Sequence, residues 1–306
     1  MHFLIHTIFL IPIIFLFAIN YAQADSITID GIERTYELHI PRGIDFSKPV
    51  PLLLVLHGGG GQGKGMIKLT GFNDVAVEYK FIVVYPDGFD KHWNDGREIN
   101  TSIKDGKKVD DVLFISKLID TLQSLYNIDN NKVFVTGISN GGFMCFRLAC
   151  EIPEKITAIA TVASSMTVEQ YSYCNPSLSI PVMIISGDQD PLVPFEGGEI
   201  GFKLLKKRGK VVSVKETVEF WVKNNECKPE PNITTVDILT DEGTKAINYL
   251  YSGGKNNSMV NYWLIEGGGH TWPGGYQYLP KSIIGRTSKQ IDASEEIWKF
   301  FSGLLR

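Results

Sequence analysis

Charged side chains are missing from the first 24 residues of this 306-residue chain, which contain no Asp, Glu, Lys or Arg. Residues 3–19 are almost wholly apolar, and residues 22–24 read Ala-Gln-Ala, the small-x-small pattern that a signal peptidase cleaves. We therefore predict that residues 1–24 form a secretory signal peptide. The mature chain would then be residues 25–306.

The same stretch lacks the Lys or Arg that usually precedes the apolar part of a signal, and it offers only the α-amine, His2 and His6. An uncleaved membrane anchor therefore stays open as the alternative. A helix of about 17 residues would be roughly 25 Å long, shorter than the ~30 Å hydrocarbon core of a bilayer. No later segment reaches membrane-spanning length, so we expect no stable membrane insertion after signal cleavage.

An excess of positive charge is also missing, because 30 basic residues face 34 acidic ones and the formal net charge is -4. Such a chain cannot hold a polyanion by counterion release, so we expect no nucleic-acid partner. Hydrophobic residues make up 43% of the chain and charged residues 21%, as in folded globular proteins. Neither a repeat nor a long Pro/Ser-rich linker divides residues 25–306, which we predict to form a single domain.

Cysteines are few, namely Cys145, Cys150, Cys174 and Cys227, and none has the C-x-x-C spacing of zinc or redox sites. Four cysteines allow three complete pairings. Cys145 and Cys150 are expected on one helix, about 140° apart around its axis, and should therefore not pair with each other. In an exported protein, disulfides are the expected use of these cysteines.

Short apolar runs alternate with segments of helical period along the chain. The expected strands are residues 36–40 (an edge strand), 51–56 (buried on both faces), 81–85, 132–136, 158–163, 182–186 and 262–265. The expected helices are residues 66–79, 112–126, 142–150, 214–225 and 291–301. This order predicts an α/β protein with a mainly parallel central sheet and helices on both faces. Ligands bind at the carboxyl ends of such strands.

A glycine-rich run at residues 58–63 follows the first buried strand. It fits the dinucleotide-binding pattern G-x-G-x-x-G, but the acidic residue about twenty positions later, Glu78, lies within a predicted helix. It also resembles a phosphate-binding P-loop, but Gly65 occupies the position of the Ser or Thr that would hold Mg²⁺. A flexible turn and an oxyanion loop remain as interpretations. Four successive glycines after His57 favour the oxyanion loop, in which residues without Cβ let backbone N–H groups approach a substrate oxygen.

Residues 137–141 read Gly-Ile-Ser-Asn-Gly, the G-x-S-x-G pattern, between a predicted strand and a predicted helix. A tight strand-to-helix turn of this kind exposes the serine hydroxyl at the sheet edge and places the helix dipole under developing negative charge. Ser139 is therefore the candidate nucleophile.

The mature chain offers four histidines as its base: His39, His57, His92 and His270. The order nucleophile, acid, histidine is typical of this architecture, and only His270 follows Ser139. We expect His57 to support the glycine-rich loop and His39 to lie on a strand.

The orienting carboxylate should lie between Ser139 and His270, after a strand. Asp188 and Asp190 both follow the predicted strand 182–186. We favour Asp190, because it lies far enough past the strand to reach the His270 loop. Its role would be to fix the tautomer of His270 and to stabilise the imidazolium. Asp188 remains as the alternative and is expected to brace the turn.

With these motifs the chain resembles the extracellular serine esterases of the polyhydroxybutyrate depolymerase and feruloyl esterase type, which have the α/β-hydrolase fold. The resemblance covers nearly all of residues 30–302 and rests on residues 56–59 (Leu-His-Gly-Gly), 85–88 (Tyr-Pro-Asp-Gly), 93–97 (Trp-Asn-Asp-Gly-Arg), 110–112, 137–143, 190–194 and 267–275. It implies Ser139, Asp190 and His270 as the catalytic triad. It also implies the N–H groups of Gly59 and Asn140 as the oxyanion hole.

The same resemblance implies a disulfide between Cys150 and Cys174. In the family, a cysteine such as Cys227 often pairs with a later Tyr-x-Gly-Cys, but residues 251–254 read Tyr-Ser-Gly-Gly here, so Cys227 lacks that partner. Trp93 and Trp272 are candidate substrate-binding walls, although an indole more commonly packs in the core.

Taken together, the sequence predicts a secreted serine carboxylic ester hydrolase that forms an acyl-enzyme with small or oligomeric esters and needs neither a metal nor another cofactor. A feruloyl or acetyl-xylan type of esterase is the alternative. A catalytically inactive, hydrolase-like binding protein is a more remote one.

Overall fold

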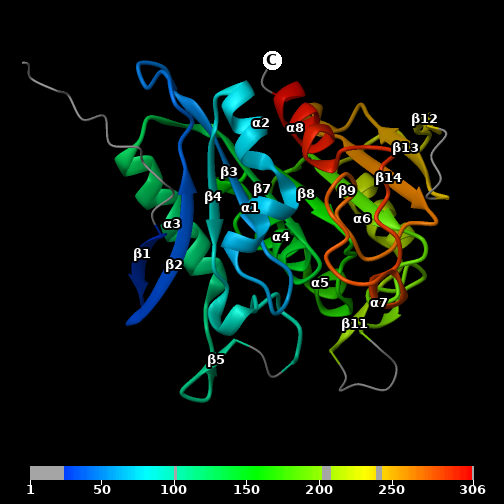
Figure 1. Cartoon of the computed structure of the whole chain (residues 1–306), viewed down its shortest axis with the longest axis horizontal. Helices are drawn as coiled ribbons and strands as arrows, with labels where there is room; N and C mark the ends of the chain where they lie inside the picture. The colour runs from blue at the N-terminus through cyan, green and yellow to red at the C-terminus, as the bar shows by residue number, and fades with distance from the viewer. Residues whose placement is uncertain (1–23, 100–101, 202–207, 239–242, 305–306) are drawn as a thin grey trace, which may run out of the picture.

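The computed structural model describes residues 24–99, 102–201, 208–238 and 243–304 (Figure 1). The predicted signal peptide lies outside the described residues except for Ala24, the first residue of strand β1. No helix in these ranges is both long and apolar enough to cross a membrane.

Ten strands of the described chain form one sheet, in the order β1-β2-β4-β3-β7-β8-β9-β14-β13-β12. Their bounds are β1 Ala24–Ile29, β2 Ile32–His39, β3 Val50–Leu56, β4 Ile82–Pro86, β7 Ile128–Ile138, β8 Ala158–Val162, β9 Val182–Gly187, β12 Asn232–Val236, β13 Lys245–Tyr251 and β14 Val260–Glu266. From β4 to β14 every neighbouring pair is parallel. Antiparallel strands complete both ends. The predicted α/β fold with a mainly parallel sheet is thus confirmed.

The helices are α1 Gly63–Thr70, α2 Phe72–Tyr79, α3 Asp111–Leu125, α4 Asn140–Glu151, α5 Val168–Tyr173, α6 Val214–Asn224, α7 Lys281–Ile284 and α8 Ala293–Gly303. Short 3-10 turns are η1 Phe89–Lys91, η2 Pro153–Lys155 and η3 Lys255–Asn257. Two small hairpins lie outside the main sheet, β5 Ile103–Lys104 with β6 Lys107–Lys108, and β10 Gly198–Glu199 with β11 Lys210–Val211.

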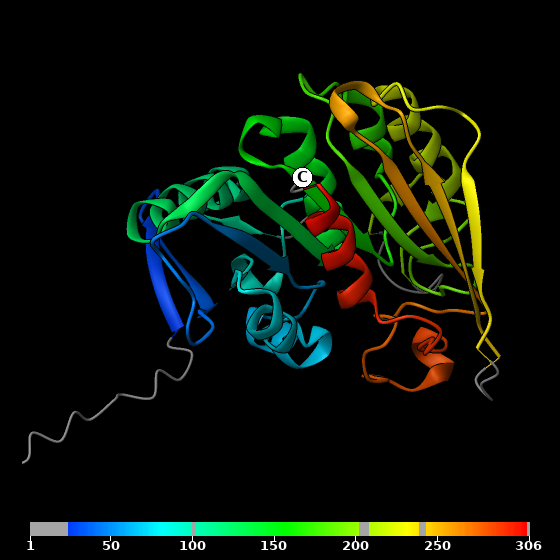
Figure 2. The same cartoon turned by 90° about the horizontal axis from the view of Figure 1, so that it is seen from above.

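Helices cover both faces of the sheet (Figure 2). The side chains of β3 show why. Leu52, Leu54 and Leu56 belong to the core cluster formed with α3, α4 and α6. Leu53 and Val55 belong to the cluster formed with α1, α2 and α8. Since side chains alternate along a strand, a strand with two apolar faces must be buried on both sides, as predicted for residues 51–56.

Two expectations about the sheet are wrong. The strand predicted at residues 36–40 is not at an edge, because β1 pairs antiparallel with β2 on its outer side. The hairpin of β12 and β13 has no counterpart among the expected strands. Most of its residues are exposed or half-buried, so its sequence lacks the continuous apolar run of the central strands.

The helix expected over residues 66–79 is two helices, α1 and α2, separated by Gly71. Gly71 has φ 67°, and its N–H donates to the carbonyl of Ile67 at 3.1 Å. A left-handed residue at this position ends a helix, and glycine adopts that conformation without a Cβ clash.

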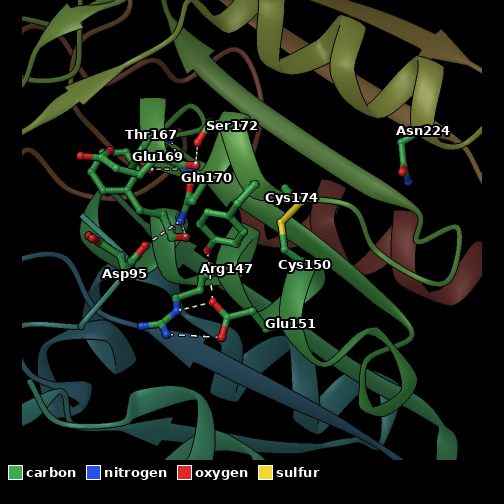
Figure 3. Close-up of a disulfide and its surroundings, with 12 residues drawn as sticks. Asp95, Arg147, Cys150, Glu151, Thr167, Glu169, Gln170, Ser172, Cys174 and Asn224 are labelled. Atoms are coloured by element: carbon green, nitrogen blue, oxygen red, sulfur yellow. Dashed lines mark hydrogen bonds and ion pairs between the residues drawn. A yellow bond between two sulfur atoms is a disulfide. The ribbon is translucent and has the colours of Figure 1, made fainter. Parts of the chain in front are cut away.

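Cys150 and Cys174 form a disulfide, as the resemblance implied (Figure 3). Cys150 lies in the last turn of α4 and Cys174 caps the end of α5, so the bond ties the two helices together. Cys145 is a buried free thiol, which agrees with the expectation that it does not pair with Cys150, and Cys227 is a half-buried free thiol.

The disulfide closes a loop with a sequence separation of 24, so its removal should destabilise the fold by about 2–4 kcal/mol. We expect C150S/C174S to lose that much free energy of unfolding in guanidinium, measured by tryptophan fluorescence. C227S is the control and should stay within about 0.5 kcal/mol of the parent. Equal unfolding midpoints for C150S/C174S and the parent would contradict this prediction.

Candidate active site

Ser139 occupies a tight turn between the end of β7 and the start of α4. Its backbone has φ 55° and ψ -120°, a region that non-glycine residues rarely adopt. Its own N–H donates to the carbonyl of Val162 in β8 at 2.9 Å. Such a conformation costs about 1–3 kcal/mol and persists only where the surrounding structure enforces it, which is common at functional sites.

Three glycines around Ser139 allow this turn to pack closely against its neighbours. A Cβ on Gly137 would lie 2.6 Å from the carbonyl carbon of Gly141. On Gly141 it would lie 2.4 Å from the carbonyl oxygen of Leu56, at the end of β3, and on Gly142 it would lie 2.1 Å from Oγ of Ser164. The glycines of the G-x-S-x-G pattern are therefore required by packing.

Asp190 and His270 meet at the carboxyl edge of the sheet, in the loops after β9 and β14. Nδ1 of His270 lies 2.7 Å from Oδ2 of Asp190, and both side chains are buried. Oδ1 of Asp190 accepts the N–H groups of Leu192 and Val193, each at 2.8 Å. The carboxylate is thereby oriented so that Nδ1 carries the proton, which leaves Nε2 of His270 as the basic nitrogen.

The backbone of His270 is held as firmly as its ring. Its N–H donates to the carbonyl of Ile284 at 2.6 Å, and its carbonyl accepts the hydroxyl of Tyr278 at 2.7 Å. Burial, with the nearby charge of Asp190, raises the pKa of Tyr278, so its hydroxyl stays protonated and able to donate. The structure therefore adds Tyr278 and Ile284 to the residues that position His270.

Asp188, the alternative acid, points elsewhere. Its Oδ1 accepts the N–H of Gly267 at 2.7 Å, which braces the turn that begins the His270 loop. The structure thus brings Asp190, and not Asp188, to His270.

His57 uses both ring nitrogens within the fold. Nδ1 donates to the carbonyl of Gly58 and Nε2 accepts the N–H of Gly88, each at 2.8 Å. Because Nε2 accepts a hydrogen bond, the imidazole is neutral, and burial favours this form by lowering the pKa of His57. A ring with both nitrogens committed cannot serve as a base, in line with the supporting role expected from the sequence. His39 lies on β2 and does not line the cavity described below.

The glycine loop (residues 58–61) presents a free donor beside Ser139. The N–H groups of Gly60 and Gly61 donate to the carbonyls of Lys91 and Gly58, at 2.8 and 3.0 Å. That of Gly59 has no acceptor among the described residues. Asn140 begins α4, and N–H groups in the first turn of a helix lack intrahelical acceptors. A Cβ on Gly59 would lie 3.7 Å from Cβ of Asn140, so the two predicted oxyanion donors are neighbours.

The side chain of Asn140 is fixed by the segment after β4. Oδ1 accepts the N–H of Trp93 at 2.8 Å, and Nδ2 donates to Oδ2 of Asp95 at 2.6 Å. Asp95 forms a buried ion pair with Arg97 at 2.6 Å. The carbonyl of Asp95 accepts Nε2 of Gln170 from α5, and Figure 3 shows these two residues. The sequence assigned no role to Asp95, Arg97 or Gln170, although Asp95 and Arg97 belong to the 93–97 motif.

Trp93 and Trp272 do not form the substrate walls that the sequence suggested. Both indoles are essentially unexposed and neither lines the cavity. Nε1 of Trp93 donates to the carbonyl of His57 at 2.9 Å, and Nε1 of Trp272 donates to Oγ of Ser294 at 3.1 Å. Each indole N–H thus has an acceptor inside the fold, and both rings pack in the core, the more common interpretation.

Ser139 and His270 line one cavity of about 760 Å³. Its wall combines the glycine loop with apolar and aromatic side chains, and its polar members include two arginines and two further histidines, His57 and His92. The lining includes Gly59, Met66, Leu69, His92, Arg97, Ile99, Asn140, Phe143, Leu192, Ile200, Arg208, Tyr276, Tyr278, Leu279 and Ile284. Within the described ranges, no group of three or more His, Cys, Asp or Glu side chains is placed to hold a metal ion.

Two known proteins that are similar to this chain are named as esterases. A family model described as phospholipase/carboxylesterase matches residues 45–219. The putative esterase NocK of Nocardia uniformis subsp. tsuyamanensis is 29% identical over 287 residues, covering 92% of this chain and 82% of that protein. Feruloyl esterase D of Neurospora crassa is 25% identical over 293 residues, covering 92% of this chain and 85% of that protein.

Among solved structures, the acetyl xylan esterase from Aspergillus awamori matches with a TM-score of 0.62 and 16% identity, covering 92% of this chain and 99% of that one. This likeness supports the fold described above.

Gly141 and Gly65 provide a matched pair for testing the packing of the Ser139 turn. A Cβ on Gly141 would overlap backbone oxygens, whereas nothing lies within 4 Å of a Cβ on Gly65 in α1. We expect Gly141→Ala to destabilise the protein by at least about 3 kcal/mol, or to abolish soluble yield. Gly65→Ala should be neutral or stabilising by up to about 1 kcal/mol, because alanine favours helix. Equal unfolding midpoints for the two variants would refute this account.

Proposed function

The chain belongs to the phospholipase/carboxylesterase family of α/β-hydrolases, and on that premise we propose that it is a secreted serine esterase resembling polyhydroxybutyrate depolymerases that cleaves small or oligomeric esters. Its general activity is that of an esterase, as in its relatives. The observation that carries the proposed mechanism is the hydrogen bond of 2.7 Å between Asp190 and His270. His270 and Ser139 line the same cavity.

In the proposed mechanism Oγ of Ser139 attacks the ester carbonyl carbon while Nε2 of His270 accepts the hydroxyl proton. The tetrahedral intermediate collapses as the ester C–O bond breaks and His270 returns that proton to the leaving alcohol. Water then attacks the acyl-enzyme in the same way, which releases the acid and restores the Ser139 hydroxyl. The buried carboxylate of Asp190 stabilises the imidazolium in both steps.

The carbonyl oxygen, which becomes negative in each tetrahedral intermediate, would accept hydrogen bonds from the N–H groups of Gly59 and Asn140. Such donors stabilise the transition state by about 3 kcal/mol each when they are fixed in place beforehand. The side-chain bonds of Asn140 to Trp93 and Asp95 support that arrangement. The start of α4 adds the positive end of its dipole.

An aryl or sugar ester is the second candidate substrate, because two similar proteins are named a feruloyl esterase and an acetyl xylan esterase. The mixed apolar and aromatic wall of the cavity suits the acyl part of either class. A catalytically inactive binding protein is the remaining alternative. The geometry of Ser139, Asp190 and His270 argues against it, and covalent labelling of Ser139 by a fluorophosphonate would exclude it.

Export is supported by two features. The charge-free, apolar residues 1–24 match a secretory signal, and the Cys150–Cys174 disulfide suits an oxidising compartment. In this proposal residues 25–306 act as a single esterase domain.

Ser139→Ala should abolish the activity without unfolding the protein. We expect kcat for p-nitrophenyl butyrate to fall on the order of 10⁶-fold, because the nucleophile is lost. Circular dichroism should match the parent. Turnover equal to that of the parent would refute the triad.

The same pair of proteins, parent and Ser139→Ala, should be assayed with methyl ferulate, acetylated xylan and a 3-hydroxybutyrate trimer. Preferred hydrolysis of the trimer by the parent supports the depolymerase-like substrate. Preferred hydrolysis of methyl ferulate or of acetylated xylan would replace it with the alternative.

Asp190→Asn and Asp188→Asn are the same substitution two positions apart. An amide at position 190 would turn its NH₂ group toward Nδ1 of His270 and favour the wrong tautomer, so we expect kcat to fall about 10⁴-fold. An amide oxygen at position 188 can still accept the N–H of Gly267, so that variant should keep most of its activity. Equal loss in both variants would show that Asp190 has no special role.

A further inference from the structure

Besides His270 and His57, a third histidine, His92, lines the cavity, and the proposed mechanism does not use it. We propose that Nε2 of His92 accepts a hydrogen bond from a free hydroxyl on the acyl part of the substrate, at the second or third carbon. His92 would thereby select hydroxyacyl esters over plain acyl esters. The proposal rests on the esterase function above and specifies the substrate class of the same site.

One ring nitrogen of His92 is hydrogen-bonded within the protein, and the other can accept a hydrogen bond from a ligand. Nδ1 lies 2.9 Å from the carbonyl oxygen of Asp90, and because a carbonyl can only accept, Nδ1 carries the proton. In the neutral ring Nε2 is then an acceptor. It has no partner among the described residues, and the side chain is half-buried rather than exposed.

The ring lies directly beside the oxyanion donors. A Cβ on Gly59 would lie 3.4 Å from Cδ2 of His92 and 3.6 Å from Nε2. A substrate carbonyl held by Gly59 would therefore place its nearest acyl carbons next to the imidazole. Only a hydroxyl close to the ester carbonyl would reach Nε2, which excludes the distant phenol of a cinnamoyl ester.

The backbone that carries His92 is strained and firmly held. Asp90 and Lys91 have φ of 49° and 60°, a region that residues other than glycine rarely adopt. The carbonyl of Lys91 accepts the N–H of Gly60 at 2.8 Å, and the carbonyl of His92 accepts Oγ of Ser102 at 2.9 Å. Strain maintained in this way is typical of functional segments, and here it fixes the ring relative to the glycine loop.

The order of the strands indicates which side of the ester His92 would contact. Ser139 follows β7, which lies between β3 and β8 in the sheet. His92 follows β4 on one side of it, and His270 follows β14 on the other. Because His270 must protonate the leaving alcohol, the alcohol lies on the β14 side. The acyl chain then extends toward the β4 side, where His92 is located.

The test compares kcat/KM for matched methyl esters at pH 8. The pairs are methyl (R)- or (S)-3-hydroxybutyrate with methyl butyrate, and methyl lactate with methyl propionate. We expect His92→Phe to lower the ratio of hydroxylated to plain ester about three- to tenfold for one of these pairs, the loss expected of one hydrogen bond. The pair that responds identifies the hydroxyl position. His92→Gln, whose amide oxygen can accept, should retain most of the ratio.

His39→Phe makes the same substitution at a histidine outside the cavity and should leave the ratio unchanged. A ratio that is unaltered in His92→Phe for every pair would overturn the proposal. So would a change confined to 2-hydroxyethyl butyrate relative to ethyl butyrate, because that hydroxyl is on the alcohol. The ratio can be measured only in enzyme that hydrolyses esters. An unchanged ratio would therefore overturn the role of His92 alone, whereas failure of the triad would appear as activity retained in Ser139→Ala.

Discussion

Close backbone contact between the first turn of α4 and the end of β3 is the constraint on which the candidate site depends. A Cβ on Gly141 would lie 2.4 and 2.6 Å from the carbonyl oxygens of Leu56 and His57, so the two segments touch without an intervening side chain. The contact brings the Ser139 turn against the glycine loop. It also places Gly59 beside Asn140, the two residues whose N–H groups form the proposed oxyanion hole. A side chain at position 141 would push the Ser139 turn away from the glycine loop, and so from the N–H of Gly59.

A buried polar network holds Asn140, the residue after Ser139, from the segment that follows β4. Asn140 bonds to Trp93 and Asp95, Asp95 pairs with Arg97, and Gln170 donates to the carbonyls of both Asp95 and Phe143. Burying an ion pair costs desolvation free energy, and removing one partner of such a pair typically destabilises a protein by about 3–5 kcal/mol. The bonds of this network hold the side chain of Asn140 in one orientation at the start of α4.

The central strands, α3, α4, α6 and α8 could be predicted from periodicity, because each buries a continuous or regularly spaced apolar surface. The Asp190–His270 contact was anticipated from chain order and from the positions of the loops after strands. The hairpin of β12 and β13 was missed because its side chains are largely exposed. Trp93 and Trp272 were placed wrongly because residue type does not reveal that an indole N–H has an inward acceptor. Contacts such as Asp95 with Asn140, 45 positions apart, depend on tertiary geometry that no local pattern records.

The bond between Asp190 and His270 joins residues 80 positions apart in the sequence, and it exists only when β14 lies beside β9. Since β14 follows β9 in the chain, a chain that ends after β9 would contain Ser139 and both proposed oxyanion donors. It would lack His270, the proposed base. Hydrolytic competence in the proposed mechanism is therefore a property of the finished chain. In that mechanism, chains that end before β14 would remain inert toward esters, because His270 follows that strand.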